Sequence, residues 1–143
     1  MFSISPSKNV DISKKMFGII MPIGKGGFGK VWKVEHKKLK TIFAMKEMSK
    51  AKVVNKKSVS SVMNERTFLA KLNHPFIVNM TSAFQDRENL YLVMDYLDGG
   101  DLRYHLGNKR YFSEKETKFF LANIIIGLEY MHRHKIIHRD IKP

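Results

Sequence analysis

Glycines near the start of the chain stand in a G-x-G-x-x-G-x-V pattern, formed by Gly24, Gly26, Gly29 and Val31. Glycine has no Cβ, so its backbone can come close to a phosphate group. The pattern alone fits two phosphate-binding designs, one in which the loop opens a helix and one in which it joins two strands. A P-loop is excluded because no G-K-[ST] sequence closes the motif.

The residues after the glycines favour the second design. Val31, Trp32 and Val34 are β-branched or aromatic, which is typical of a strand rather than of a helix. We therefore expect one strand over residues 17–24, a second over residues 30–35, and a glycine lid between them. Pro22 cannot donate to a strand ladder, so an irregularity is expected just before the lid.

A lysine and a glutamate form the next candidate pair. Lys46 lies among apolar residues in a strand predicted over residues 41–48, and a buried ammonium group is costly unless an anion meets it. Glu65 falls within the apolar stripe of a helix predicted over residues 58–72 and has no basic residue three or four positions away. The lid favours a phosphate-binding Lys46 paired with Glu65. The alternative places Lys46 on the solvent face and Glu65 at the exposed edge of the stripe.

The remaining pattern predicts how these residues are positioned. Two further strands are expected over residues 80–85 and 89–95, a hinge over 95–100, a short helix over 101–106 and a long helix over 113–134. Ser113 and Glu116 form a capping box at the start of the long helix. The predicted fold is α+β, with a five-stranded antiparallel sheet, one main helix and the start of a helical second lobe. The long helix is apolar around most of its circumference, so we expect burial on nearly all sides and a chain that is incomplete.

The C-terminal residues carry a second group of candidates. Asp140, in a loop after the long helix, can orient a hydroxyl group and accept its proton, and Lys142 can neutralise charge on a phosphoryl group. A metal site at His132, His134 and His138 is the alternative. It is less favoured because the ligand spacing and the acidic partners are poor.

The chain has a net charge of +13, and the charge is uneven. Residues 1–57 contain 14 basic and 3 acidic residues, whereas residues 58–143 contain 12 and 10. Nucleic acid or anionic lipid would suit the basic half, but no nucleic-acid motif accompanies it, so solvated loops around an anion site are favoured. No apolar run reaches membrane-spanning length and no cysteine is present, so we expect no transmembrane segment and a cytoplasmic location, with the nucleus as the alternative. Residues 1–15 are predicted to be a flexible arm.

The lid, Lys46, Glu65 and the ending His138-Arg139-Asp140-Ile141-Lys142-Pro143 have the order and spacing of eukaryotic protein kinases, and the chain resembles that family from about residue 17 to its end. Residues 72–78 and 98–102 resemble the AGC group of serine/threonine kinases. Residues 101–106 are similar to its YANK-type members. The resemblance implies a kinase domain from residue 16, with a first lobe over 16–94, a hinge over 95–100 and part of a second lobe over 101–143.

The resemblance also implies the function and the roles of single residues. It implies phosphoryl transfer from ATP to serine or threonine hydroxyls of proteins, with Asp140 as the catalytic base and Lys142 at the γ-phosphate. Lys46 would hold the α- and β-phosphates and pair with Glu65. The residues implied for nucleotide binding are Ile23, Gly24, Lys25, Gly26, Gly27, Phe28, Gly29, Lys30, Val31, Ala44, Lys46, Met94, Asp95, Leu97 and Asp101.

The resemblance further implies where magnesium binds. The family pattern continues past Pro143 to an asparagine and a D-F-G sequence that hold the ion, so its ligands are expected beyond the end of this chain and none is assigned within it. We therefore expect the 143-residue chain to be an inactive fragment of a kinase. The alternative is a nucleotide-binding or regulatory half-domain without transferase activity.

Overall fold

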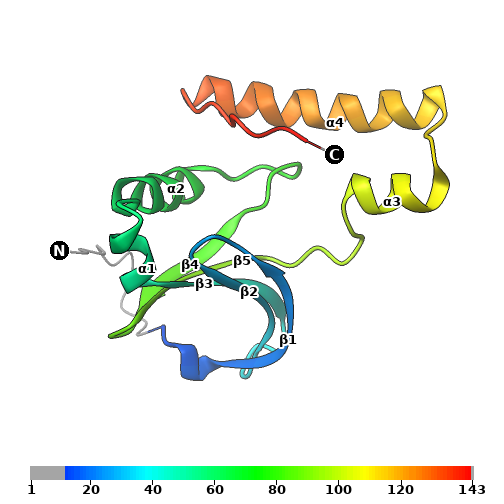
Figure 1. The fold of residues 1–143 in the computed structure, drawn as a ribbon. Helices are drawn as coiled ribbons and strands as arrows, with labels where there is room; N and C mark the ends of the chain where they lie inside the picture. Colours follow the sequence, from blue (N-terminus) through cyan, green and yellow to red (C-terminus); the bar gives the residue numbers. More distant parts are fainter. Residues whose placement is uncertain (1–11, 143) are drawn as a thin grey trace. The chain divides into compact units, whose positions relative to one another are not determined.

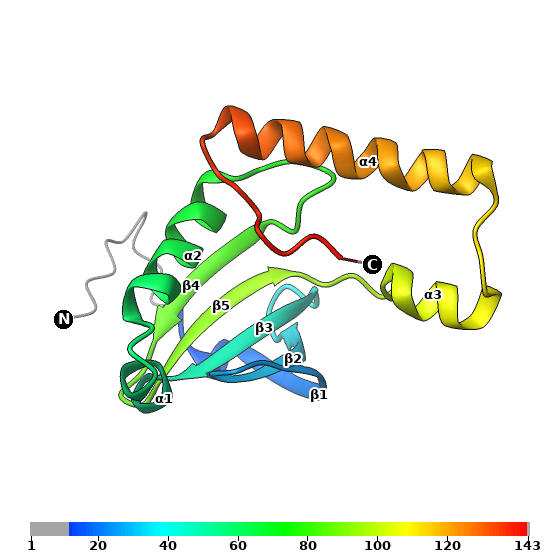
Figure 2. The same cartoon turned by 45° about the horizontal axis from the view of Figure 1, so that its top comes forward.

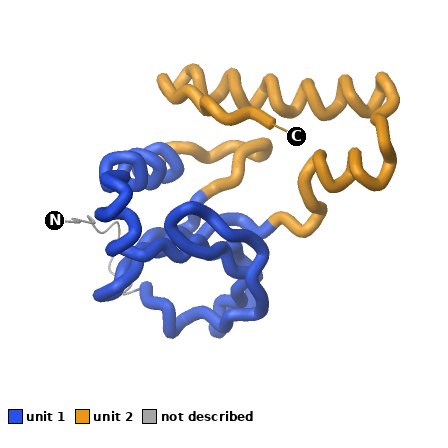
Figure 3. The backbone as a smooth tube through the Cα atoms, in the orientation of Figure 1, with its two compact units in different colours: residues 1–70, 80–96 blue, residues 71–79, 97–143 orange. Residues whose placement is uncertain are grey.

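The computed structural model describes residues 12–142, which fall into two compact units (Figure 3). The first unit comprises the described residues up to 70 together with 80–96. The second comprises residues 71–79 together with the described residues from 97 onward. No helix within residues 12–142 has the length and apolar character needed to cross a membrane.

The first unit is an antiparallel sheet with helices on one face (Figures 1 and 2). Its strands are β1 (Phe17–Lys25), β2 (Gly29–His36), β3 (Ile42–Ser49), β4 (Met80–Gln85) and β5 (Asn89–Asp95), in the spatial order β1-β2-β3-β5-β4. The turn of 3-10 helix η1 (Lys14–Met16) precedes β1, and the helices α1 (Lys50–Asn55) and α2 (Val59–Lys71) lie between β3 and β4 in the chain. The predicted five-stranded sheet is confirmed, and the predicted ends of each strand are correct to within one residue.

The strand β1 is irregular where proline interrupts it. Its pairing with β2 shifts register between Ile19 and Met21 and again between Pro22 and Gly24. Pro22 has no N–H to give to the ladder, which is the reason that the sequence predicted this irregularity. The strand therefore leaves regular pairing just before the glycines begin.

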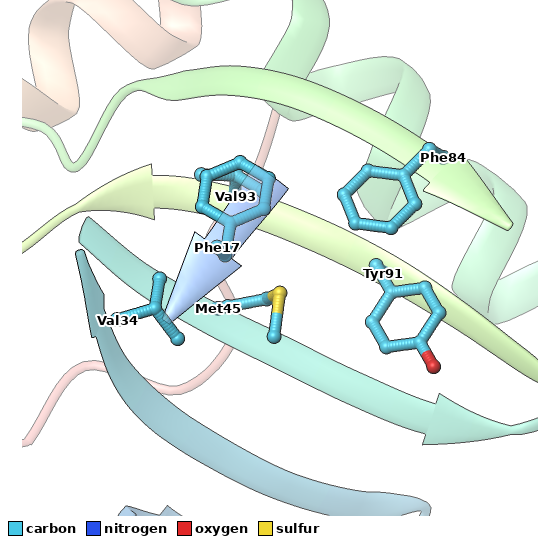
Figure 4. Close-up of a cluster of buried hydrophobic side chains, with 6 residues drawn as sticks. All are labelled: Phe17, Val34, Met45, Phe84, Tyr91 and Val93. Carbon is cyan, nitrogen blue, oxygen red and sulfur yellow. The ribbon is translucent and has the colours of Figure 1, made fainter. Parts of the chain in front are cut away.

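The two faces of β3 are buried in different clusters, because alternate side chains of a strand point to opposite sides. The cluster on the face of Met45 contains Phe17, Val34, Met45, Phe84, Tyr91 and Val93 (Figure 4). The cluster on the face of Met48 contains Met48, Val53, Val62, Leu90 and Leu92, and so includes one residue from each of α1 and α2. A charged residue in β3 must therefore find a partner on the face to which it points.

The segment before β1 is attached to this sheet. The arm predicted for residues 1–15 falls mostly on residues 1–11, which lie outside the described residues. From Lys14 the chain forms η1, and the Lys14 ammonium donates a hydrogen bond to Glu47 Oε1 at 2.7 Å. The backbone N–H of Lys37 donates to the carbonyl oxygen of Met16 at 2.9 Å, so both the start and the end of η1 are held by the sheet unit.

The second unit contains the helices α3 (Leu102–Lys109) and α4 (Glu114–Arg133). The helix α3 continues three residues past its predicted end, passing through Gly107 although glycine is a weak helix former. The capping box predicted for α4 is confirmed, since Ser113 Oγ accepts from the backbone N–H of Glu116 while the Glu116 side chain accepts from the backbone N–H of Ser113. The hydrogen bond from the Lys109 ammonium, together with those from Ser113, lowers the pKa of Glu116 to about 2.

Much of the apolar surface of α4 is open to solvent. Only Gly127 and Met131 of this helix are buried, and Met131 packs with Leu72 and Ile136. Phe119 and Ile125 are 63% and 62% exposed. The burial on nearly all sides that the sequence predicted is therefore not seen within residues 12–142, because few apolar side chains of the second unit face this helix.

Candidate functional site

The structure brings Lys46 and Glu65 together, as their positions in the sequence predicted. Lys46 Nζ donates a hydrogen bond to Glu65 Oε1 at 2.6 Å, and the two side chains are 25% and 37% exposed. Lys46 points to the same face of β3 as Met48, the face on which Val62 of α2 is buried. Because Val62 fixes α2 against this face, Glu65, one turn further along the helix, lies within reach of the lysine. The structure therefore favours the paired arrangement over the alternative, in which Lys46 lies on the solvent face and Glu65 at the exposed edge of the stripe.

The lid, defined here as residues 24–31, is placed beside this pair by the register of the strands. Val31 is the partner of Gly24 in β1 and of Lys46 in β3, so these residues form one row across the sheet. Gly29 packs so closely on β3 that a Cβ atom at this position would collide with the carbonyl oxygen of Glu47. The backbone of β2 therefore reaches β3 only because Gly29 has no side chain.

The other predicted nucleotide-binding residues of the first unit surround the same row. Ala44 lies two residues before Lys46 on its face of β3 and pairs with Met94 of β5, and Asp95 pairs with Phe43. Lys25 and Lys30 pair with each other at the base of the lid. The predicted residues that the first unit contains are Ile23, Gly24, Lys25, Gly26, Gly27, Phe28, Gly29, Lys30, Val31, Ala44, Lys46, Met94 and Asp95.

Two predicted nucleotide-binding residues, Leu97 and Asp101, belong to the second unit. Leu97 is 70% exposed. Asp101 is the N-cap of α3, where its carboxylate accepts a hydrogen bond from the backbone N–H of Tyr104 at 2.8 Å. This helix-capping role could have been read from the sequence, because aspartate is favoured immediately before the first turn of a helix.

Asp140 and Lys142 are also in the second unit, and they contact each other. Lys142 Nζ donates to Asp140 Oδ2 at 2.8 Å, and the two side chains are 69% and 71% exposed. The backbone N–H of Asp140 donates to Nδ1 of His138 at 3.2 Å. The hydrogen bond from Lys142 and its positive charge lower the pKa of Asp140, so this carboxylate is ionised at neutral pH.

A third carboxylate, Glu47, has more partners than either candidate, and the sequence did not single it out. It accepts hydrogen bonds from Lys14 Nζ at 2.7 Å, from Trp32 Nε1 at 2.6 Å and from the Tyr91 hydroxyl at 3.3 Å. Burial alone would raise the pKa of Glu47, but these hydrogen bonds outweigh it and lower the pKa. The alternation along β3 could have shown that Glu47 faces away from Lys46, toward the aromatic cluster.

Tyr91 links Glu47 to a turn at the far end of the sheet. Its hydroxyl, which points away from the apolar cluster in Figure 4, donates to Asp86 Oδ2 at 2.7 Å. Burial, and then this hydrogen bond to Asp86, raise the pKa of Tyr91. Desolvation opposes ionisation of Asp86, but the hydrogen bonds from Tyr91 and from the backbone of Asn89 and Glu88 lower the pKa of Asp86 overall. The network that includes Glu47 therefore ties η1, β2, β3 and β5 together.

The metal site considered at His132, His134 and His138 has no counterpart in the part of the chain that the structure describes. Within residues 12–142 no three histidine or acidic side chains come together in a way that could hold a metal ion. His134 Nδ1 is instead within hydrogen-bond distance, 2.9 Å, of the carbonyl oxygen of Tyr130.

Comparison with known proteins agrees with the geometry. Residues 17–143 match the family model described as "Protein kinase domain". The chain is 46% identical over 121 residues to a probable serine/threonine-protein kinase of Dictyostelium discoideum, covering 85% of this chain and 26% of that protein. It is 43% identical over 136 residues to human serine/threonine-protein kinase 32B, covering 95% and 33%. It is 42% identical over 141 residues to serine/threonine-protein kinase sgk-1 of Caenorhabditis elegans, covering 98% and 30%.

These relatives are serine/threonine kinases of the AGC group, as the motifs of the sequence predicted. The chain spans about a quarter to a third of the length of the curated relatives named above. The region that it matches begins at β1 and includes the lid, the Lys46–Glu65 pair and the segment of Asp140. On this evidence, the chain belongs to the protein kinase family.

Proposed function

We propose that this chain forms the ATP-binding part of a protein serine/threonine kinase, in which phosphate passes from ATP to serine or threonine hydroxyls of proteins. The observation that carries the proposal is the ion pair of 2.6 Å between Lys46 and Glu65, in register with the glycine lid. The names of the relatives support the choice of serine and threonine as acceptors.

The donor set of Lys46 fits a polyphosphate. An ammonium group has three N–H donors, and Lys46 uses one of them, toward Glu65, within residues 12–142. The side chain is 25% exposed, so it is not closed off from solvent. Hydrogen bonds between an ammonium and a phosphate oxygen are charge-assisted, and Glu65 holds the lysine in one orientation for them.

The lid supplies the second part of the nucleotide site. Protein kinases generally use ATP with magnesium, and a glycine-rich loop covers the phosphates in this family. A Cβ atom at Gly26 would meet no atom within 4 Å, so this part of the lid has open space beside it. Magnesium would neutralise charge on the phosphates, and we assign no ligand for it within residues 12–142.

In this proposal, Asp140 and Lys142 act in the phosphoryl-transfer step. Asp140, whose pKa is lowered, is an ionised acceptor that can orient a substrate hydroxyl and receive its proton. Lys142 can donate to a phosphate oxygen as the negative charge moves, in place of its hydrogen bond to Asp140.

Calorimetry of ATP binding tests the nucleotide site. Lys46→Ala is expected to weaken binding about 10- to 100-fold, because a charge-assisted hydrogen bond contributes roughly 1.5–3 kcal/mol. The matched control is Lys38→Ala, which removes the same charge from an exposed turn of the same unit and should leave binding unchanged. A folded wild-type chain that fails to bind ATP, or equal losses in the two variants, would contradict the proposal.

Because the 143-residue chain by itself is expected to be inactive, a transfer assay with labelled ATP and a serine-containing peptide is made on a protein in which this chain continues through the expected asparagine and D-F-G sequence. Asp140→Asn should retain ATP binding and lower any transfer by at least about 100-fold, the scale of general acid–base catalysis. ATP binding without transfer by the wild type of that longer protein would favour a nucleotide-binding module instead.

A further inference from the structure

The tip of the lid, formed by Gly27 and Phe28, makes contacts within the protein that ATP binding does not require. Phe28, at the tip, packs against the cluster of Met48, Val53 and Val62, which lies on the side of the sheet that carries the helices. Its carbonyl oxygen accepts a hydrogen bond from the backbone N–H of Ser49 at 3.1 Å. The tip is therefore attached to the end of β3 and to α1, in addition to its own hairpin pairing.

A lysine from outside the lid completes this attachment. Lys56 Nζ donates a hydrogen bond to the carbonyl oxygen of Gly27 at 3.1 Å. The same ammonium lies 5.7 Å from the centroid of the Phe28 ring, within the range of a cation–π interaction. The Lys56 side chain thus contacts two successive residues of the lid tip. Gly27 lies 29 positions before Lys56 in the sequence.

The backbone of Lys56 is fixed, so its side chain starts from a defined place. Lys56 is the C-cap of α1, and its N–H donates to the carbonyl oxygen of Lys52 at 3.1 Å. Its own carbonyl oxygen accepts from Ser58 Oγ at 2.9 Å. Val53 of the same helix is fully buried. A lysine on a free loop would not specify the position of the lid, but a lysine on this cap can.

The same turn leads directly into α2, the helix that carries Glu65. The lid tip and the partner of Lys46 are therefore supported by one continuous segment, from α1 through Lys56 to α2. A displacement of this segment would move the lid tip and the Lys46–Glu65 pair together. This physical link is absent from the sequence pattern, which contains no signal that relates Lys56 to the glycines.

We propose that Lys56 is a positioning residue that holds the lid tip through the Gly27 carbonyl and the Phe28 ring, and so sets the affinity for a nucleoside triphosphate. The effect on ATP rests on the proposed function, whereas the effect on the lid itself does not. A single exposed hydrogen bond and an exposed cation–π contact are together expected to change ATP affinity about three- to tenfold.

Hydrogen–deuterium exchange on the nucleotide-free chain tests the attachment. Lys56→Met, which keeps the length of the side chain and removes its charge and donors, should speed amide exchange about threefold or more in the lid and at Ser49. Exchange in β4 and β5 should stay the same. The matched control is the adjacent Lys57→Met, which makes the same chemical change at a residue that the described contacts do not connect to the lid. Unchanged lid exchange in Lys56→Met, or faster exchange spread over the whole sheet, would overturn the proposal.

Calorimetry and stopped-flow measurements of ATP binding then test the consequence. Lys56→Met should weaken ATP binding about three- to tenfold, mainly through faster dissociation, and Lys56→Arg should restore it because a guanidinium can donate to the same carbonyl and lie over the same ring. Equal affinity in wild type and Lys56→Met, or failure of Lys56→Arg to rescue, would overturn the role in binding. Absence of ATP binding by the wild type would reject the proposed function and leave the exchange result to decide on the attachment.

Discussion

Lys46 and Glu47 are neighbours in β3, yet their ion pairs are built differently on the two faces of the sheet. Glu47 accepts hydrogen bonds from Lys14, Trp32 and Tyr91, and its side chain is 18% exposed. Lys46 makes one hydrogen bond, to Glu65, among the contacts of residues 12–142, and both side chains are more exposed than that of Glu47.

The difference separates a charge whose hydrogen-bonding capacity is used within the fold from a charge that retains capacity for a further partner. Both carboxylate oxygens of Glu47 are already used, one by Lys14 and Tyr91 and the other by Trp32, so little capacity remains for another molecule. The Lys46 ammonium retains unused donors, and Glu65 holds it in place from one side. Adjacent residues of one strand therefore differ in their surroundings because their side chains point to opposite faces of the sheet.

Among the changes that test the difference between Glu47 and Lys46, Glu47→Ala is expected to have the largest effect, and that effect is on stability. The change leaves the partly buried Trp32 N–H without its acceptor and removes the partner of Lys14, so the free energy of unfolding should fall by about 2–3 kcal/mol. Urea unfolding measures it. Glu35→Ala is the control, because its pair with Lys40 is exposed and should change the free energy of unfolding by at most about 0.5 kcal/mol. Equal losses in the two variants would remove the distinction between the networks.

A smaller effect, on binding rather than on stability, is expected from Glu65→Gln. The free energy of unfolding should change by less than about 0.5 kcal/mol, because the pair with Lys46 is only partly buried. ATP affinity should fall about five- to tenfold, because the lysine loses the charge that orients it. Calorimetry compares this variant with Glu129→Gln, which breaks an exposed pair with Arg133 in α4. A variant that loses stability and keeps its ATP affinity would reverse the assignment of the two faces.

The smallest effect on stability is expected from lowering the pH, which removes the charge of Glu47 in the wild type. The pKa of Glu47 is lowered in the folded protein, so its ionised form contributes stability above the ordinary glutamate pKa of about 4.3. That contribution is lost as the pH falls through the lowered pKa. The stability advantage of the wild type over Glu47→Gln, measured by urea unfolding, should therefore be constant from about pH 7 to pH 5 and shrink below about pH 4. An advantage that does not change with pH would show that the charge of Glu47 is not what the network uses.

Apart from the short helices η1 and α1, the order of strands and helices could be predicted because the residues that determine it are close in sequence. The alternating and helical patterns predicted β4 and β5 with the observed ends, and the capping box predicted the start of α4 at Ser113. The pair of Lys46 and Glu65 could also be predicted, because the glycine lid beside Lys46 favoured a tertiary partner for an acidic residue that has no local partner in its apolar stripe. These predictions depend on local backbone preference and on the cost of burying a charge.

The contacts of Glu47 and Lys56 were decided by the tertiary structure alone. Lys14, Trp32 and Tyr91 meet at Glu47 only after β2, β3 and β5 pair in one register and η1 folds onto the sheet. Lys56 meets Gly27 only after α1 packs through Val53 on the same cluster as Phe28. No pattern of residue types specifies these contacts, because they depend on how the strands are aligned and on where a helix ends in space. The sequence by itself indicated a candidate phosphate-binding lysine in β3 and its glutamate partner in α2, and the register of the sheet decided what supports them.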